Sequence, residues 1–257
     1  MNNRIIKSFI KLIKNISIWL TDILLPKEKR VKLLEQLGPD GLYENIPRAE
    51  NFDLSSRAGF KTNKISAIFG YQNKLCRQAI WEIKYRANKK LLEDFSLLLY
   101  EYILEELSDL DTFHNFKKPY LIPIPSAKSR DREKGFNQCI LITRELLKID
   151  KERNGNNFQS AENFLIKKED TPHQARVSNR KKRLKNLIGA FSINKNCDFP
   201  TKTELLSAET KAQSWTSSSF IIIDDVITTG ATMREAFRTL NSAGIPTRHI
   251  RGFALAH

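Results

Sequence analysis

The order of apolar and polar positions predicts an α/β fold for the second half of the chain. Between residues 120 and 257, short apolar runs alternate with amphipathic segments. Short runs rich in β-branched residues are typical of strands buried on both faces of a parallel sheet, and apolar residues three and four apart indicate helices. We therefore expect a mostly parallel central sheet flanked by helices. The expected strands are 120–124, 164–167, 220–223 and 249–256, and the expected helices are 138–147 and 233–240.

The first part of the chain contains two predicted helical segments separated by a stretch with little hydrophobic pattern. Residues 1–25 form an amphipathic, basic helix pattern that charges interrupt too often for a membrane span. Contact of this helix with a membrane surface is the less favoured alternative to packing on the protein. Residues 27–75 indicate a small appended region, and the helical period returns over 71–106 with a break near 85–89. We divide the chain into an N-terminal appendage, 1–75, and a main domain, 76–257.

Composition narrows the partners and the compartment. A formal net charge of +14 favours anionic partners such as phosphates, nucleic acid or an acidic membrane surface. Cys76, Cys139 and Cys197 form no paired motif, which argues against a disulfide scaffold or a zinc ribbon and predicts a cytoplasmic protein. The four histidines show no ligand spacing either, so no metal site built from Cys and His is predicted.

The most informative stretch is 220–233, with the sequence FIIIDDVITTGATM. A buried strand leads into Asp224 and Asp225, then into a loop of hydroxyls and glycine, and then into a helix. At the carboxyl end of a parallel strand, this loop and the helix N-terminus would present N–H groups to a phosphate. The two carboxylates can accept hydrogen bonds from ribose hydroxyls. The stretch therefore predicts a sugar-phosphate site. The loop residues assigned to it are Thr228, Thr229, Gly230, Ala231 and Thr232.

This stretch resembles the phosphoribosyl-diphosphate (PRPP) signature of the type I phosphoribosyltransferases. The resemblance implies a phosphoribosyltransferase-like core that binds PRPP together with Mg²⁺. The metal would be held through substrate oxygens and carboxylates. Asp224 and Asp225 would be the catalytic pair, because they lie near the ribose hydroxyls and the positive charge that develops at C1.

Four blocks in order narrow the resemblance to the ComF family, the competence-associated relatives of these enzymes. Together they cover roughly residues 78–257. The blocks are Ile80-Trp81-Glu82-Ile83-Lys84-Tyr85; Ile122-Pro123-Ile124-Pro125-Ser126 with Arg130 and Gly135-Phe136-Asn137-Gln138; Thr171-Pro172-His173-Gln174 with Arg183, Asn186 and Gly189-Ala190-Phe191; and DDVITTGAT.

The resemblance also assigns the remaining site residues. The diphosphate loop would follow the first sheet strand and use Ser126, Lys128, Arg130 and Lys134. A basic loop over 171–185 would close over the site or contact nucleic acid, through Gln174, Arg180 and Arg183, together with the adjacent Asn186. A solvated helix face explains the basic run equally well. Trp81 and Tyr85 are expected to pack, Lys84 could pack or contact substrate, and Cys139 is expected to be a buried thiol.

Two departures from the family pattern stand out. The N-terminal zinc-ribbon cysteines of ComF relatives are missing from this sequence, and Lys134 stands where the family usually has arginine. Lysine keeps the charge of arginine but not its bidentate geometry.

Three functions remain open at this point. The first is a ComF-like protein that binds PRPP or a related phosphorylated ribose with Mg²⁺. It would either transfer phosphoribosyl to a nitrogen acceptor or only bind the sugar phosphate, with a family-implied role in DNA uptake. The second is a non-catalytic accessory factor for transformation that binds single-stranded DNA and works with DNA-processing proteins. The third and weaker alternative is a nucleotide-salvage phosphoribosyltransferase.

Overall fold

A computed structural model describes residues 29–49, 65–114, 118–127, 132–168, 188–194 and 218–257 of the chain. The amphipathic helix predicted for 1–25, the basic loop 171–185 and most of the polar segment 195–219 lie outside these ranges. Within the described residues, no helix is both long and apolar enough to cross a membrane.

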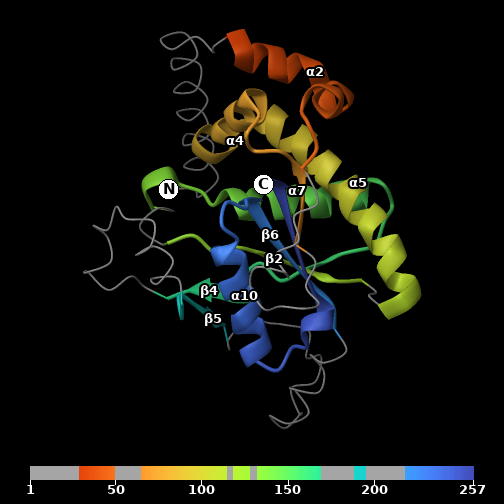
Figure 1. Ribbon diagram of the computed structural model, residues 1–257, viewed down its shortest axis with the longest axis vertical. Helices are drawn as coiled ribbons and strands as arrows, with labels where there is room; N and C mark the ends of the chain where they lie inside the picture. The colour runs from red at the N-terminus through yellow and green to blue at the C-terminus, as the bar shows by residue number, and fades with distance from the viewer. Residues whose placement is uncertain (1–28, 50–64, 115–117, 128–131, 169–187, 195–217) are drawn as a thin grey trace, which may run out of the picture.

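A five-stranded parallel sheet forms the centre of the fold (Figure 1). Every neighbouring pair in it is parallel. This confirms the predicted α/β architecture. The strand order is β1-β7-β6-β2-β3, with β1 at Ile65–Phe69, β2 at Tyr120–Pro123, β3 at Gln159–Ser160, β6 at Phe220–Val226 and β7 at Ile250–Ala256.

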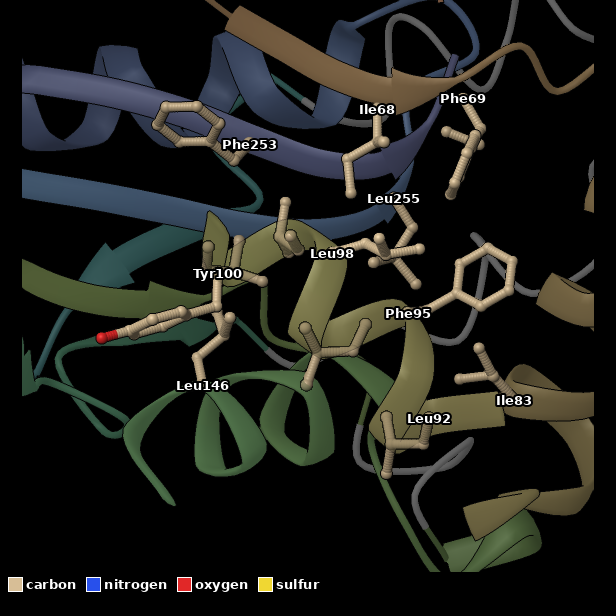
Figure 2. Close-up of a cluster of buried hydrophobic side chains, with 14 of the residues drawn as sticks. Ile68, Phe69, Ile83, Leu92, Phe95, Leu98, Tyr100, Leu146, Phe253 and Leu255 are labelled. Carbon is tan, nitrogen blue, oxygen red and sulfur yellow. The ribbon is translucent and has the colours of Figure 1, made fainter. Parts of the chain in front are cut away.

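Strand β6 is buried on both faces, as its run of apolar residues predicts. Successive side chains point to opposite faces of a sheet. Ile221 and Ile223 therefore belong to one apolar cluster, and Phe220 and Ile222 belong to the other. Figure 2 shows the first cluster, in which Phe253 and Leu255 of β7 meet side chains of the covering helices.

Helices cover both faces of the sheet. Three helices pack on the face of Ile221: α4 (Lys74–Arg86), α5 (Lys89–His114) and α7 (Gln138–Glu152). Helix α10 (Ala231–Ser242) packs on the opposite face through Met233, Ala236, Phe237 and Leu240. The break between α4 and α5 falls at Ala87, which has a left-handed φ of 48°, close to the break predicted near 85–89.

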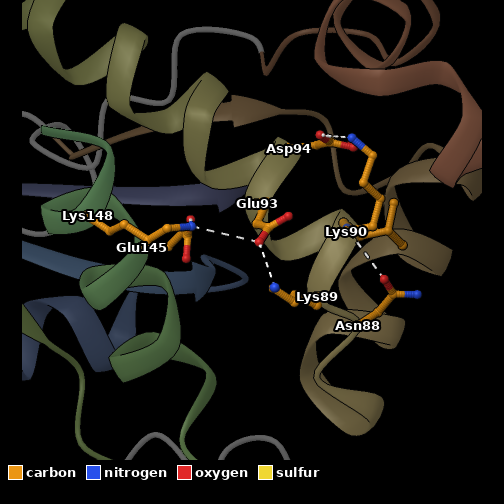
Figure 3. A network of polar contacts seen from close by, with 8 residues as sticks. Asn88, Lys89, Lys90, Glu93, Asp94, Glu145 and Lys148 are labelled. Atoms are coloured by element: carbon orange, nitrogen blue, oxygen red, sulfur yellow. Dashed lines mark hydrogen bonds and ion pairs between the residues drawn. The ribbon is translucent and has the colours of Figure 1, made fainter. Parts of the chain in front are cut away.

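Polar contacts join the start of α5 to α7 (Figure 3). Lys148 of α7 lies 3.8 Å from Glu93 of α5, and Lys89 lies 3.5 Å from the same carboxylate. These side chains are partly or largely exposed, and such ion pairs stabilise a fold by at most about 1 kcal/mol. The apolar cluster in Figure 2 therefore supplies most of the energy that holds α5 against α7.

The structure differs from the sequence prediction before residue 76. Strand β1 lies in the stretch expected to be an appendage, yet it pairs with β7 and is part of the central sheet. Helix α2 (Lys29–Asn45), kinked at Gly38, buries Leu34 and Leu42 in the same core as α5. The predicted boundary at residue 75 thus falls after a strand of the sheet. No local pattern indicates this, because β1 pairs with a strand near the other end of the chain.

The strand predicted at 164–167 forms outside the central sheet. Strand β4 (Leu165–Lys167) pairs antiparallel with β5 (Phe191–Ile193) in a separate ribbon. The ribbon is tied to α10, because the N–H of Gly189 donates a hydrogen bond to Oε1 of Glu235 at 2.6 Å.

Candidate functional site

Two buried carboxylates lie at the carboxyl end of the central strand. Asp224 and Asp225 are the fifth and sixth residues of β6 and are 7% and 4% exposed. They belong to the strand itself rather than following it as predicted. Strand β2 ends beside them, since the N–H of Ile124 donates to the carbonyl of Ile223 at 2.9 Å. This edge of a parallel sheet is where ligands bind in open α/β folds.

Asp225 is held by side chains from two helices. Its Oδ2 lies 2.8 Å from Nζ of Lys84 on α4 and accepts a hydrogen bond from Nε2 of Gln138 on α7 at 3.2 Å. Its Oδ1 accepts the N–H of Val226 at 2.9 Å. Burial would lower the pKa of Lys84, but the charge of Asp225 and its hydrogen bond with the ammonium outweigh burial and raise it. Lys84 therefore stays an ammonium that neutralises part of the acid pair.

Asp224 is also buried, and among the described residues it has no cationic partner at hydrogen-bond distance. Its Oδ1 accepts the N–H of Asp225 at 2.9 Å and the thiol of Cys139 at 3.5 Å. Burial and the charge of Asp225 raise the pKa of Asp224 from its ordinary 3.8 to about 8. At neutral pH this carboxyl is thus mainly protonated and can donate one hydrogen bond, while Asp225 accepts.

Cys139 is the buried thiol that the sequence predicts. Burial and the two nearby carboxylates raise the pKa of Cys139 well above its usual value. A thiol of this kind is neutral and a poor nucleophile. Its part in the site is to donate a hydrogen bond to Asp224.

The loop after β6 has the geometry of an anion site. Gly230 adopts a left-handed φ of 67° and begins α10 without a side-chain cap. The N–H of Ala231 has only a long contact, 3.4 Å, to Oγ1 of Thr229, and Thr228 is exposed. A helix N-terminus with few capped donors favours a bound anion through its N–H groups and its dipole.

The segment Gly135-Phe136-Asn137-Gln138 joins the end of β2 to the acid pair. Gly135 has a left-handed φ of 77°. Asn137 is buried and caps α7, because its Oδ1 accepts the N–H of Cys139 at 2.8 Å and its Nδ2 donates to the carbonyl of Ile124 at 3.0 Å. Gln138 then reaches Asp225. Sequence reasoning had no role for Asn137 or Gln138 beyond their membership of a block.

The structure brings together only part of the predicted phosphate-binding set. Ser126 follows β2 at the same edge of the sheet, and Lys134 precedes Gly135. Lys128, Arg130, Gln174, Arg180, Arg183 and Asn186 lie outside the described residues, so their assignment stays a prediction.

Sequence reasoning missed the part that α4 takes in the site. Lys84, left open between packing and substrate contact, pairs with Asp225. Trp81 and Tyr85, expected to pack, lie against each other with ring centroids at 5.5 Å, but they are 43% and 50% exposed. No local pattern connects Lys84 with Asp225, so only the membership of Lys84 in the first family block pointed to a role for this residue.

The donor atoms fit a metal only in combination with a substrate. Among the described residues, ligand atoms of Cys139, Asp224 and Asp225 lie within 4.8 Å of one another. The neutral thiol is a poor ligand for Mg²⁺, which prefers oxygen and keeps several waters or substrate oxygens. The carboxyl oxygens of Asp224 and Asp225 are the donor type that Mg²⁺ prefers, and Asp224 would have to release its proton to act as a ligand.

A cavity lies away from the acid pair, beside the edge strand β1. It measures about 480 Å³ and is bordered by β1, α2 and α5. Four carboxylates but only one arginine, Arg48, line this cavity. The excess of negative charge makes the cavity unsuited to a phosphate. The acid pair is not among its lining residues: Asp40, Tyr43, Arg48, Ala49, Ala67, Ile68, Leu98, Glu101, Tyr102, Glu105 and Glu106.

Comparison with known proteins gives one informative match. No family model matches the chain. A curated protein, "Competence protein F" of Haemophilus influenzae, is 29% identical over 151 residues, which is 58% of this chain. The match spans 56% of the length of that relative. It confirms the resemblance to the ComF family that the four sequence blocks predict.

Proposed function

We propose that the chain binds PRPP or a closely related phosphorylated ribose, together with Mg²⁺, at the carboxyl end of β6. The observation that carries this proposal is the buried acid pair, followed five residues later by Gly230 and the uncapped start of α10. The 5-phosphate would accept hydrogen bonds from N–H groups of residues 228–232. The ribose hydroxyls would face Asp224 and Asp225.

The two carboxyls suit two different roles toward the sugar. Protonated Asp224 can donate a hydrogen bond to a ribose oxygen, whereas Asp225 can accept one and stabilise positive charge near C1. Lys84, which lies 2.8 Å from Asp225, would place its ammonium near a diphosphate oxygen. Asp224 and Asp225 would hold Mg²⁺ together with substrate oxygens and water, and the ion would supply positive charge to the diphosphate. In a transfer reaction the bond from C1 to the diphosphate oxygen would break. A bond from C1 to a nitrogen would form, and the nitrogen would lose a proton.

The relative's name suggests the biological setting. We infer a competence-associated role for this chain from the similarity to Competence protein F. Binding of a phosphorylated ribose is compatible with either a catalytic or a purely binding role in that setting.

Isothermal titration calorimetry tests the site. The native chain is titrated with PRPP with and without Mg²⁺, beside an Asp224→Asn/Asp225→Asn double variant. Asp40→Asn, which alters an exposed carboxylate on α2, is the matched control for loss of charge. We expect the native chain and Asp40→Asn to bind PRPP saturably and only in the presence of Mg²⁺, and the double variant to show no binding. Absence of saturable binding to the native chain refutes the proposal, and equal binding to the double variant refutes the site.

A further inference from the structure

Gln138 is the first residue of α7, and its neighbours fix its place in the fold. Asn137 before it is buried, and its Nδ2 donates to the carbonyl of Ile124, directly after β2, at 3.0 Å. Cys139 after it is also buried, and its N–H donates to Oδ1 of Asn137 at 2.8 Å. The backbone of Gln138 is therefore tied to the end of β2 and to the core.

The side chain of Gln138 contacts the acid pair from this fixed point. Its Nε2 donates to Oδ2 of Asp225 at 3.2 Å, and Nζ of Lys84 lies 2.8 Å from the same oxygen. The other oxygen of Asp225 accepts the N–H of Val226 at 2.9 Å. Donors from α7, α4 and β6 thus contact both oxygens of the carboxylate, and together they set its orientation.

The two side-chain donors to Asp225 differ in their effect on a bound cation. The ammonium of Lys84 carries a positive charge, which repels a metal ion at the same carboxylate. The amide of Gln138 donates a hydrogen bond but is neutral. Gln138 can therefore orient Asp225 without weakening the attraction of this carboxylate for Mg²⁺.

We propose that Gln138 is a positioning residue that holds Asp225 in the orientation that binds Mg²⁺. This role rests on the proposed function, because the metal would bind together with the sugar phosphate. Side chains that hydrogen-bond to a metal-binding residue fix the direction of its ligand atoms, and their loss typically lowers metal affinity by about 10- to 100-fold. Gln138 acts through Asp225 and makes no contact of its own with the reacting atoms.

Calorimetric titrations of PRPP at a series of Mg²⁺ concentrations test this role. Gln138→Met keeps the length of the side chain and removes the donor. We expect it to raise the Mg²⁺ concentration for half-maximal PRPP binding by about 10- to 100-fold. Gln138→Lys keeps a donor but adds a cation, so it should also raise this concentration, by at least about tenfold. A native Mg²⁺ requirement in either variant overturns the proposal, because a glutamine that only stabilised the fold could be replaced in this way without affecting the metal.

Gln78→Met is the matched control. Nε2 of Gln78 donates to Oε1 of Glu82, another buried carboxylate, at 3.4 Å, but both residues lie on α4 and neither belongs to the acid pair. This variant should keep the native Mg²⁺ requirement. An equal rise in Gln78→Met and Gln138→Met overturns the proposal, because the effect would then not depend on Asp225.

A double-mutant cycle without ligand separates this proposal from the proposed function. In urea unfolding, Gln138→Met combined with Asp225→Ala should cost less stability than the sum of the two single losses, because both substitutions remove the same contact. Gln78→Met combined with Asp225→Ala should give additive losses. Additivity in the Gln138 cycle overturns the proposal even where PRPP binds. Failure of PRPP to bind the native chain at any Mg²⁺ concentration refutes the sugar-phosphate site, and the cycle still decides whether Gln138 holds Asp225.

Discussion

The substitution Asp224→Asn should make the protein more stable at pH 8 and remove much of its pH dependence. The asparagine keeps the shape of the side chain, and its Oδ1 can still accept the N–H of Asp225 and the thiol of Cys139. The substitution removes a buried carboxyl whose ionised form is costly to keep inside the folded protein.

The direction of the pKa shift determines whether stability rises or falls with pH. The pKa of Asp224 is about 8 in the folded protein and near 3.8 when it is free of that environment. Between these values the folded state holds a proton that the unfolded state releases, so the free energy of unfolding falls as pH rises. The upper limit is about 1.4 kcal/mol per pH unit.

The magnitude is smaller than this limit, because part of the raised pKa of Asp224 comes from the charge of the adjacent Asp225 and changes with it. We expect the wild-type protein to lose about 2 kcal/mol through this group between pH 5 and 8. The Asp224→Asn variant should lose little over the same window. The two proteins should therefore be equally stable near pH 4, with the variant more stable by about 2 kcal/mol at pH 8.

Urea unfolding at a series of pH values measures this difference. Asp40→Asn controls for the loss of one negative charge at an exposed position. Asp225→Asn should behave in the opposite way and destabilise the protein, because it breaks the ion pair with Lys84. Parallel pH curves for the native chain and Asp224→Asn would refute our account of the pair.

Three further predictions concern the supports of the site, each measured by urea unfolding. Lys84→Met should cost about 2 kcal/mol, since it leaves Asp225 without a counter-ion, and Lys89→Met on an exposed face should cost less than about 0.5 kcal/mol. Asn137→Ala should cost about 2 kcal/mol, because it uncaps α7 and leaves the buried carbonyl of Ile124 without its donor. Asn45→Ala removes only an exposed hydrogen bond to the carbonyl of Gly41 and should be nearly neutral. Gly252→Ala should cost about 1 kcal/mol, because the added Cβ would lie 2.8 Å from Sδ of Met233, and pairing it with Met233→Ala should give less than the sum of the two losses. Equal losses of stability in the site variant and its control would contradict the predictions for Lys84 and Asn137. A double variant of Gly252 and Met233 whose loss equals the sum of the two single losses would contradict the third prediction.

The sequence predicts those parts of the fold whose signal is local. The apolar run of β6 and the break between α4 and α5 are each written in a few consecutive residues, and both are confirmed. Strand β1 could not be predicted in the same way. It consists of five residues in a weakly patterned stretch, and its place in the sheet depends on β7.

The same distinction holds for the site. Asp224, Asp225 and the loop to Thr232 form one continuous motif, so the sequence points to them directly. The contacts of Lys84 and Gln138 with Asp225 join three distant segments, and only the folded sheet brings them together. The exposure of Trp81 and Tyr85 could not be read from their spacing, because one helical turn between aromatics is equally typical of a buried face.

The place of β7 in the sheet has a consequence for how the protein forms during synthesis. This strand lies between β1 and β6, so the sheet stays in two parts until residues 250–256 have left the ribosome. Until then β1 has no partner strand in the central sheet, and Asp224 and Asp225 lack the neighbouring strand that helps to enclose them. Contacts between residues so far apart in sequence form slowly. The nascent chain therefore depends on late pairing to complete both its core and its binding edge.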